Sequence, residues 1–529
     1  MSETTVKPCY EDDQVRLFLG NCLEVLAGME PCSIDAVVCD PPYALTELPV
    51  ASIADALAAW TGGNRAYIPA TGAGFMGRKW DKFVPPPAAW DQCMRVLKPG
   101  GHLLAFSAPR TQDLMGVSIR LAGFEIRDGI DWLFGSGFPK SLDVSTGIDR
   151  LKRRDYVLAA IRLGLDVPGN NLHDWTKAEH SPGDEWWGKF KAHLSPEEWG
   201  CLEREVTGKR TSGATAGMQQ LGASGIKGGT YDVTAPATED AARWSGFGTA
   251  LKPAHEPIIV ARKPLEGTVA ANVLEYGTGA LNIDGCRVAH ASDADRAESE
   301  GKNRHADFGS GPRDNHVFGA DDRARAEQGN YDGSAGRWPP NVLLGEEAAD
   351  ELDRQSTGTR AAKPSKTGNA GRAAREGIYG DGNGLPRNYT AISRDDPGGA
   401  SRFFPVFRYE AKADASERPR LADGTTHPTV KPLSLVRWLV RLATPPGGLV
   451  LDPFGGSGTT GEACVIEGFR CILIERDPEY AELIRARLSK PIQPDLFGGA
   501  VIAVEPEERH CERVARRPSQ GVLADWGDL

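Results

Sequence analysis

Apolar and polar positions over the first 150 residues follow two alternating patterns. Short continuous apolar runs, such as Ala36–Cys39, are typical of strands buried on both faces of a sheet. Apolar residues spaced three and four apart predict amphipathic helices at 87–101, ending at Gly100-Gly101, and at 111–124. Strands and helices in alternation predict a mostly parallel sheet covered by helices on both faces.

A second block with the same pattern lies near the end of the chain, at 427–490. It predicts helices at 432–444, 459–468 and 478–490, with strands at 448–454 and 470–476. Each block alone has too few strands for a large sheet. We therefore predict one Rossmann-like, doubly wound α/β domain assembled from both ends of the chain.

The middle of the chain lacks this rhythm. Residues 151–250 read as a helical insertion followed by a flexible loop, and 251–426 are rich in Gly, Ser, Asp, Asn and Arg. Strand-like islands occur in this second part at 256–264, 280–284 and 339–344. The predicted division is 1–150, 151–250, 251–426, 427–490 and a C-terminal tail at 491–529.

Composition narrows the class of protein. The 529 residues carry a net charge of −11, which argues against a generally basic nucleic-acid binder but leaves room for a local basic groove. The 10 cysteines are scattered without metal-like spacing, so we expect no metal and a reducing, cytoplasmic setting. No apolar run is long enough to span a membrane, and the N-terminus is too polar for a secretory signal.

A glycine-rich turn joins a predicted strand to a predicted helix in "VLDPFGGSGTTGEA", residues 450–463. Such a turn lets a ligand approach the backbone and presents free N–H groups at the helix start. It is not a Walker loop, since Gly461-Glu462 stands where Gly-Lys is required. Glu475 ends the next strand, where an acidic side chain typically accepts hydrogen bonds from ribose. The combination predicts a nucleoside cofactor; the alternative is a tight turn with an exposed glutamate.

A second unusual feature is the end of the strand in "AVVCDPPY", residues 36–43. Two prolines cannot continue a central strand because neither has an N–H to donate. The strand therefore ends on a carboxylate, Asp40, and an aromatic ring, Tyr43. The alternative is an ordinary Asp-Pro turn.

Together, "DPPY" at 40–43 and "DPFGGSGTT" at 452–460 resemble the motifs of the DNA amino-methyltransferases. The order, with the catalytic motif first and the cofactor motif last, resembles the permuted β class, in which a target-recognition region (here within 251–426) lies between the two. "HPTVKPLSLVRWLV" from His427 resembles the segment that precedes the cofactor motif in that class. "GFMGRKWD", "FGSGFPKSLD" and "EYGTGALNIDGCRV" further resemble methylases carried by phages and prophages.

The resemblance implies a catalytic role for Asp40, Pro41, Pro42 and Tyr43. Asp40 and the carbonyl of Pro41 would accept hydrogen bonds from the target amine, while the prolines fix the backbone. Tyr43 would stack on a target base that has left the duplex.

The resemblance also implies an S-adenosylmethionine site. Asn21 stands where the family usually has an aspartate, so it could still accept a hydrogen bond from the cofactor's adenine, but without a charge. The implied cofactor-binding residues are Asn21, Cys22, Thr429, Lys431, Asp452, Pro453, Phe454, Gly455, Gly456, Ser457, Gly458, Thr459, Thr460 and Glu475.

The implied reaction is methylation of the N6 amine of adenine in duplex DNA, because "DPPY" goes mostly with adenine and "SPPY" with cytosine. Methylation of cytosine N4, and an inactive DNA-binding protein of the same fold, remain as alternatives, and a methylase of RNA or protein ranks lower. A homodimer and a partner restriction nuclease stay open. The candidate DNA-binding residues are Lys140, Lys363, Lys366 and Arg372.

Overall fold

The computed structural model describes most of the two predicted α/β blocks and parts of the middle of the chain. The described residues are 7–45, 48–70, 79–135, 141–162, 192, 194–196, 204–211, 230–303, 336–356, 399–407, 419–421, 424–427 and 429–489. Two compact units make up the chain: one comprises Met1–Gly135 and His255–Leu529, the other Ser136–Ala254.

A ten-stranded sheet forms the centre of the first unit, in the order β1-β2-β12-β11-β3-β4-β8-β5-β9-β10. Most neighbours pair in parallel, while β1 with β2, and β8 with both β4 and β5, pair antiparallel. The strands are β1 (Tyr10–Glu11), β2 (Val15–Leu19), β3 (Ile34–Cys39), β4 (Leu97–Phe106), β5 (Glu125–Leu133), β8 (His255–Arg262), β9 (Val342–Gly345), β10 (Val406–Phe407), β11 (Leu449–Asp452) and β12 (Arg470–Glu475). The predicted α/β fold with a mostly parallel sheet built from both ends of the chain is confirmed.

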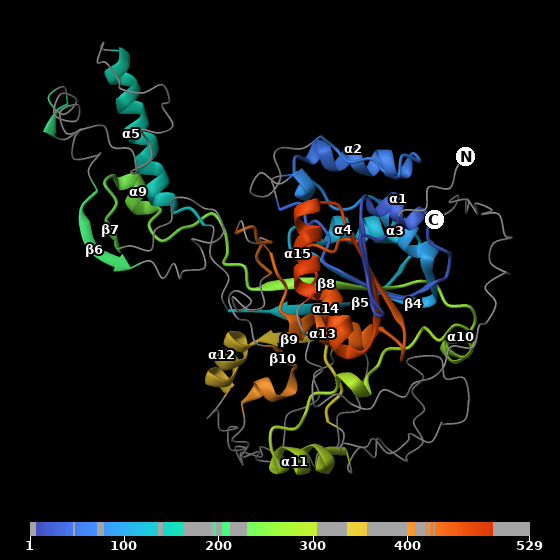
Figure 1. Cartoon of the computed structure of the whole chain (residues 1–529). Coiled ribbons are helices and arrows are strands. Elements are labelled where there is room, and N and C mark those ends of the chain that lie inside the picture. The colour runs from blue at the N-terminus through green and yellow to red at the C-terminus, as the bar shows by residue number, and fades with distance from the viewer. Residues whose placement is uncertain are drawn as a thin grey trace, which may run out of the picture. The chain divides into compact units, whose positions relative to one another are not determined.

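Helices cover both faces of this sheet (Figure 1). On one face lie α1 (Cys22–Ala27), α2 (Val50–Thr61), α3 (Pro87–Val96) and α4 (Gln112–Leu121); on the other lie α13 (Leu433–Ala443), α14 (Thr459–Glu467) and α15 (Pro478–Leu488). The remaining elements are η2 (Lys79–Asp81), α10 (Val269–Tyr276), η4 (Asp284–Cys286), α11 (Asp293–Asn303), α12 (Glu346–Ser356) and η6 (Ala400–Phe403).

The sequence of β3 explains this two-faced burial. Successive side chains of a strand point to opposite faces. Ala36 and Val38 pack into one hydrophobic core with α13, and Val37 and Cys39 pack into the other with α3. All six residues of β3 are buried, including Asp35, whose carboxylate pairs with Lys98 at 2.7 Å.

Two details differ from the sequence expectations. The helix predicted to reach Gly101 ends at Val96, because Leu97 already pairs with Ile34 of β3 as the first residue of β4. Residues 280–284 form no strand; the 3-10 helix η4 begins at their end. The strand expected at 256–264 is confirmed as β8, which enters the sheet antiparallel between β4 and β5.

The second unit has its own small framework (teal and green in Figure 1). It contains α5 (Val144–Arg162), the hairpin of β6 (Val206–Thr211) and β7 (Thr230–Thr234), and α9 (Glu239–Arg243). Buried Asp149 of α5 holds these parts together, since it pairs with Arg204 and accepts a hydrogen bond from Thr238 Oγ1 at 2.9 Å.

Among the described residues, the structure contains no helix long and apolar enough to cross a membrane.

Candidate active site

The two motifs lie at the ends of neighbouring strands. β3 and β11 pair in parallel, with Ala36 opposite Val450 and Val37 opposite Leu451. Asp40 follows the end of β3 and Asp452 is the last residue of β11, so both carboxylates lie at the same edge of the sheet. Ligand sites of open α/β sheets lie at this edge, outside the carboxyl ends of the strands.

At the tip of β3, two carboxylates and two donors form a closed ring, which we call the Asp40 cluster: Asp40, Tyr43, Glu256 and Lys431. Tyr43 Oη donates to Asp40 Oδ1 at 2.5 Å and lies 3.4 Å from Glu256 Oε2. Lys431 Nζ donates to Asp40 Oδ2 at 2.7 Å and lies 3.4 Å from the same Glu256 oxygen. Each donor therefore bridges the two acids.

Burial governs the protonation of the Asp40 cluster. Tyr43 is only 9% exposed, and burial together with the two acids raises the pKa of its phenol well above the ordinary value, so it stays a donor. Burial lowers the pKa of Lys431, but Asp40 and Glu256 outweigh burial and raise that pKa overall. Burial raises the pKa of Glu256 against the opposing effect of Lys431.

The backbone around Tyr43 is held by Asp81, a residue that the sequence analysis did not single out. Its Oδ1 accepts hydrogen bonds from the N–H of Tyr43 at 2.8 Å and of Ala44 at 3.0 Å, and its Oδ2 from that of Leu45 at 3.0 Å. Ala44 has φ 59°, a left-handed conformation that lets successive N–H groups converge on one anion. Asp81 is 2% exposed and anchors the loop that follows β3.

Substitution of Asp81 by Asn is expected to destabilise the fold by about 2 kcal/mol. The amide has one oxygen where the carboxylate has two. Its NH2 group would therefore face at least one backbone N–H that now donates to a carboxylate oxygen. Urea unfolding of Asp81→Asn measures this loss. Asp91→Asn is the matched control, because Asp91 forms a half-exposed surface pair with Arg65. Equal stability of Asp81→Asn and wild type would contradict the anchoring role.

The glycine-rich turn after β11 has the backbone that its sequence requires. Gly456 and Gly458 have φ of 52° and 75°, which residues with a side chain rarely adopt. Buried Arg487 of α15 stabilises the turn. It pairs with Glu462, and its Nη1 donates to Ser457 O at 3.2 Å. The turn is therefore rigid before any ligand arrives.

Glu475 and His427 flank this turn. Glu475 Oε2 accepts a hydrogen bond from Gly456 N, and its Oε1 from Asp477 N, both at 2.7 Å. A Cβ on Gly456 would lie 3.4 Å from His427 Nε2. The ring of His427 stacks on Trp80 at 6.2 Å, and its Nδ1 lies 2.5 Å from Thr429 O.

His427, Thr429 and Lys431 thus connect the two motifs. His427 lies against the glycine-rich turn, while Lys431, four residues later, contacts Asp40 and Tyr43. Asn21 caps α1, with its side-chain oxygen accepting from Leu23 N at 3.1 Å, directly after Gly20, whose N–H donates to Glu475 O.

Asp452 is buried, with its Oδ1 accepting from Phe454 N at 2.9 Å. Burial raises the pKa of Asp452 to about 7, although hydrogen bonds from Thr460 and Phe454 lower it. Its carboxyl therefore binds a proton more tightly in the folded than in the unfolded state. Its contribution to stability is present at low pH and is lost as pH rises through 7.

We expect the free energy of unfolding of wild type, relative to Asp452→Asn, to fall between pH 4 and pH 7 by at most about 1.4 kcal/mol for each pH unit. Urea unfolding of both proteins across this range measures the difference. Asp284→Asn, at an 82% exposed side chain, is the control substitution. A pH-independent difference for Asp452→Asn would refute the assignment.

Some predicted residues cannot be placed, and others were missed. Lys140, Lys363, Lys366 and Arg372 lie outside the described residues. The other predicted site residues lie in the first unit, in the loop after β3, at the start of α1, at the end of β12, or along the segment from Thr429 to Thr460. Glu256 was not among the predicted residues. The sequence feature that could have indicated it is an acidic residue near the start of an apolar strand.

Over the described residues, we find no group of His, Cys, Asp and Glu side chains that could hold a metal ion.

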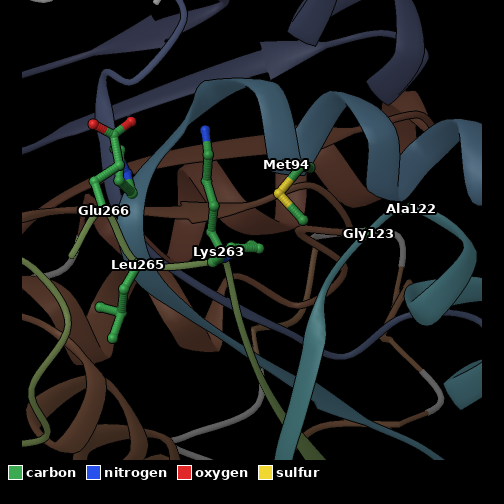
Figure 2. A pocket seen from close by; sticks show the side chains of 8 residues that line it. Met94, Ala122, Gly123, Lys263, Leu265 and Glu266 are labelled. Atoms are coloured by element: carbon green, nitrogen blue, oxygen red, sulfur yellow. The ribbon is translucent and has the colours of Figure 1, made fainter. Parts of the chain in front are cut away.

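An open depression of about 340 Å³ lies at the other end of β8 (Figure 2). Met94, Lys263 and Leu265 are among its lining residues. Lys263 directly follows β8, whereas Glu256 is near its beginning, so this depression is separate from the Asp40 cluster. Lys263 Nζ donates to Leu97 O at 2.6 Å, which gives this lysine a structural role.

Comparison with known proteins agrees with the motifs. Residues 235–486, a little under half of the chain, match the N6_N4_Mtase family model, described as "DNA methylase". This segment therefore carries the signature of that family. Asp40 and Tyr43 lie before it.

Curated relatives match over a short stretch. The chain is 44% identical over 63 residues to Type II methyltransferase M.SmaI of Serratia marcescens, and 46% identical over 61 residues to Type II methyltransferase M2.MboI of Moraxella bovis. Each match covers 12% of this chain and 22% of the relative, so the chain spans about a fifth of the length of the curated relatives it matches.

Similar solved structures include PvuII DNA methyltransferase (cytosine-N4-specific), with a TM-score of 0.34 and 13% identity over 91% of this chain and 88% of that one. The M1.HpyAVI–SAM complex has a TM-score of 0.31 and 12% identity over 90% of this chain and 99% of that one.

Proposed function

We propose that this protein is a site-specific DNA methyltransferase that moves a methyl group from S-adenosylmethionine to the N6 amine of adenine in duplex DNA. One observation carries the proposal: an Asp-Pro-Pro-Tyr strand end and a rigid glycine-rich turn lie at the ends of neighbouring strands, connected by the segment from His427 to Lys431. The match of residues 235–486 to DNA methylases supports it.

The residues around the glycine-rich turn fit S-adenosylmethionine. The backbone of Gly456 lies close to His427, since a Cβ there would already be in van der Waals contact with the ring, 3.4 Å from Nε2. Trp80, whose ring stacks on His427, has a buried Nε1–H donor without a hydrogen-bond partner among the described residues. Glu475 has lone pairs left for ribose hydroxyls after its two backbone contacts. The cofactor, when bound, supplies an electrophilic methyl group.

The other predicted cofactor residues complete this proposal. Phe454 to Gly458 would line the methionine part, and Asp452 would hold the turn. Asn21 would accept a hydrogen bond from the adenine amine through its side chain, in competition with the cap to Leu23 N. Thr429 and Lys431 would close the methionine end.

On the target side, the chain's own groups would hold an amine. An exocyclic amine is a poor nucleophile, because its lone pair is delocalised into the base. Asp40 and the carbonyl of Pro41 would accept its two N–H groups and so direct the lone pair at the methyl group. Orientation of this kind is a major source of rate. Tyr43 would stack on the base after it leaves the duplex.

Adenine is the proposed target because Asp40 begins the motif where cytosine-specific relatives mostly have serine. Methylation of cytosine N4 is the second candidate, since the same two acceptors would serve its amine. An inactive DNA-binding protein is disfavoured by the Asp40 cluster, which gathers two partly buried acids around a buried ammonium at a strand tip, an arrangement that simple binding does not require.

Incubation with methyl-tritiated S-adenosylmethionine tests the proposal. Mixed-sequence duplex DNA, total RNA and a protein extract are offered separately. We expect label in duplex DNA and background in the other two. Label confined to RNA or to protein would overturn the proposed substrate.

A further inference from the structure

Both oxygens of the catalytic carboxylate are already occupied in this structure. Asp40 Oδ1 accepts from Tyr43 and Oδ2 from Lys431, each within 2.7 Å. The Lys431 ammonium also lies over the ring of Tyr43, 5.1 Å from its centroid, and so covers one face of that ring. Each oxygen keeps a further lone pair, but a target amine that donates to Asp40, with its base on Tyr43, competes there with these two donors.

The displaced donors need another acceptor. Tyr43 keeps its proton, and Lys431 keeps its charge, because of the burial and charges described above. A buried donor left without an acceptor costs about 1–3 kcal/mol, and a buried charge costs more. Displacement without a second acceptor would therefore oppose binding of the target base.

Glu256 is placed to be that acceptor. Its Oε2 lies 3.4 Å from Tyr43 Oη and 3.4 Å from Lys431 Nζ, so a small movement brings either to a hydrogen-bond length of about 2.7 Å. Its backbone is fixed, because β8 pairs on both sides and places Glu256 opposite Trp132 of β5. Its side chain is 26% exposed, which leaves it room to turn.

We propose that Glu256 is a positioning residue that receives the Tyr43 hydroxyl and the Lys431 ammonium when the target amine donates to Asp40. The inference rests on the proposed function. In the absence of target, Tyr43 and Lys431 donate to the two oxygens of Asp40. With target bound, they donate to Glu256 instead and leave an Asp40 oxygen for the amine. No covalent bond changes in this step, and no proton leaves its oxygen or nitrogen.

Replacement of Glu256 by Gln removes the charge that attracts both donors. We expect the single-turnover rate of methyl transfer to fall about a hundredfold, the loss typical of a misplaced reacting group, with unchanged affinity for S-adenosylmethionine. A merely structural role would instead lower stability and affinity together. Glu256→Asp, which keeps the charge but withdraws the oxygens by one methylene, should lose rate as well.

Glu266→Gln is the matched control. Glu266 also accepts a hydrogen bond from a tyrosine hydroxyl, Tyr276 Oη at 2.6 Å, but at the exposed far end of β8. This variant should transfer methyl groups at the wild-type rate.

A double-mutant cycle tests the route through Tyr43. In a Tyr43→Phe background, Glu256→Gln should lose less rate than in wild type, because one of the two donors is gone. If the wild type labels DNA and Glu256→Gln labels it at the same rate, this inference alone is overturned. The same holds if Glu256→Gln loses the same factor in rate in the wild-type and the Tyr43→Phe backgrounds. A wild type that labels no DNA would overturn the proposed function, and this inference with it.

Discussion

An Asp40→Ala variant should lose roughly a thousandfold of the methyl-transfer rate, on the scale of removing one electrostatic contact from an active site. The alanine removes the acceptor that orients the amine, and it leaves Lys431 with Glu256 alone. Affinity for S-adenosylmethionine should fall little, because the turn at Gly456 and Gly458 is built by other contacts. Single-turnover transfer to DNA and cofactor titration measure the two effects.

The control for this variant is Asp284→Ala. The side chain of Asp284 is 82% exposed and forms only a surface pair with Arg287. Transfer at the wild-type rate by a folded Asp40→Ala protein would contradict the catalytic role of Asp40.

Lys431→Met is expected to reduce the free energy of unfolding by about 3 kcal/mol and to abolish detectable methyl transfer. The variant leaves two partly buried acids, Asp40 and Glu256, without their common counter-charge. Addition of Glu256→Gln to Lys431→Met should restore part of the stability, since only one acid then remains. Urea unfolding measures both changes.

Arg16→Met is the matched control for stability. Arg16 pairs with Glu11 at the same 2.7 Å, but both side chains are about half exposed, 58% and 49%. Because an exposed pair contributes about 0–1 kcal/mol, this variant should lose far less. Equal losses for Arg16→Met and Lys431→Met would show that the ammonium of the Asp40 cluster has no special role.

The sequence patterns were sufficient to predict the parts of the fold that depend on local periodicity. The continuous apolar run of β3 and the strand–turn–helix from Leu449 to Glu467 could be read directly, and the order of the motifs indicated that the two ends of the chain share one sheet. Pairing partners of the middle strands could not be read. Nothing in residues 255–262 says that β8 runs antiparallel between β4 and β5.

The dependence on tertiary packing also explains why Asp81 and Glu256 were not predicted. Asp81 acts on N–H groups 36 to 38 positions away, and Glu256 meets Tyr43 across 213 positions. Such contacts follow from tertiary packing and leave no local pattern. Asp40, Tyr43 and Glu475 could be singled out because each lies at or shortly after the end of a strand, where the geometry of α/β sheets brings distant motifs together.

The most direct measurement of the central claim is nucleoside analysis of DNA treated with trideuteromethyl-labelled S-adenosylmethionine. After digestion of the duplex, mass spectrometry identifies which nucleoside has gained the labelled methyl group. Our account predicts labelled N6-methyldeoxyadenosine with wild type and none with Asp40→Ala. Labelled N4-methyldeoxycytidine alone would contradict the adenine assignment, and unlabelled DNA would contradict the proposed reaction itself.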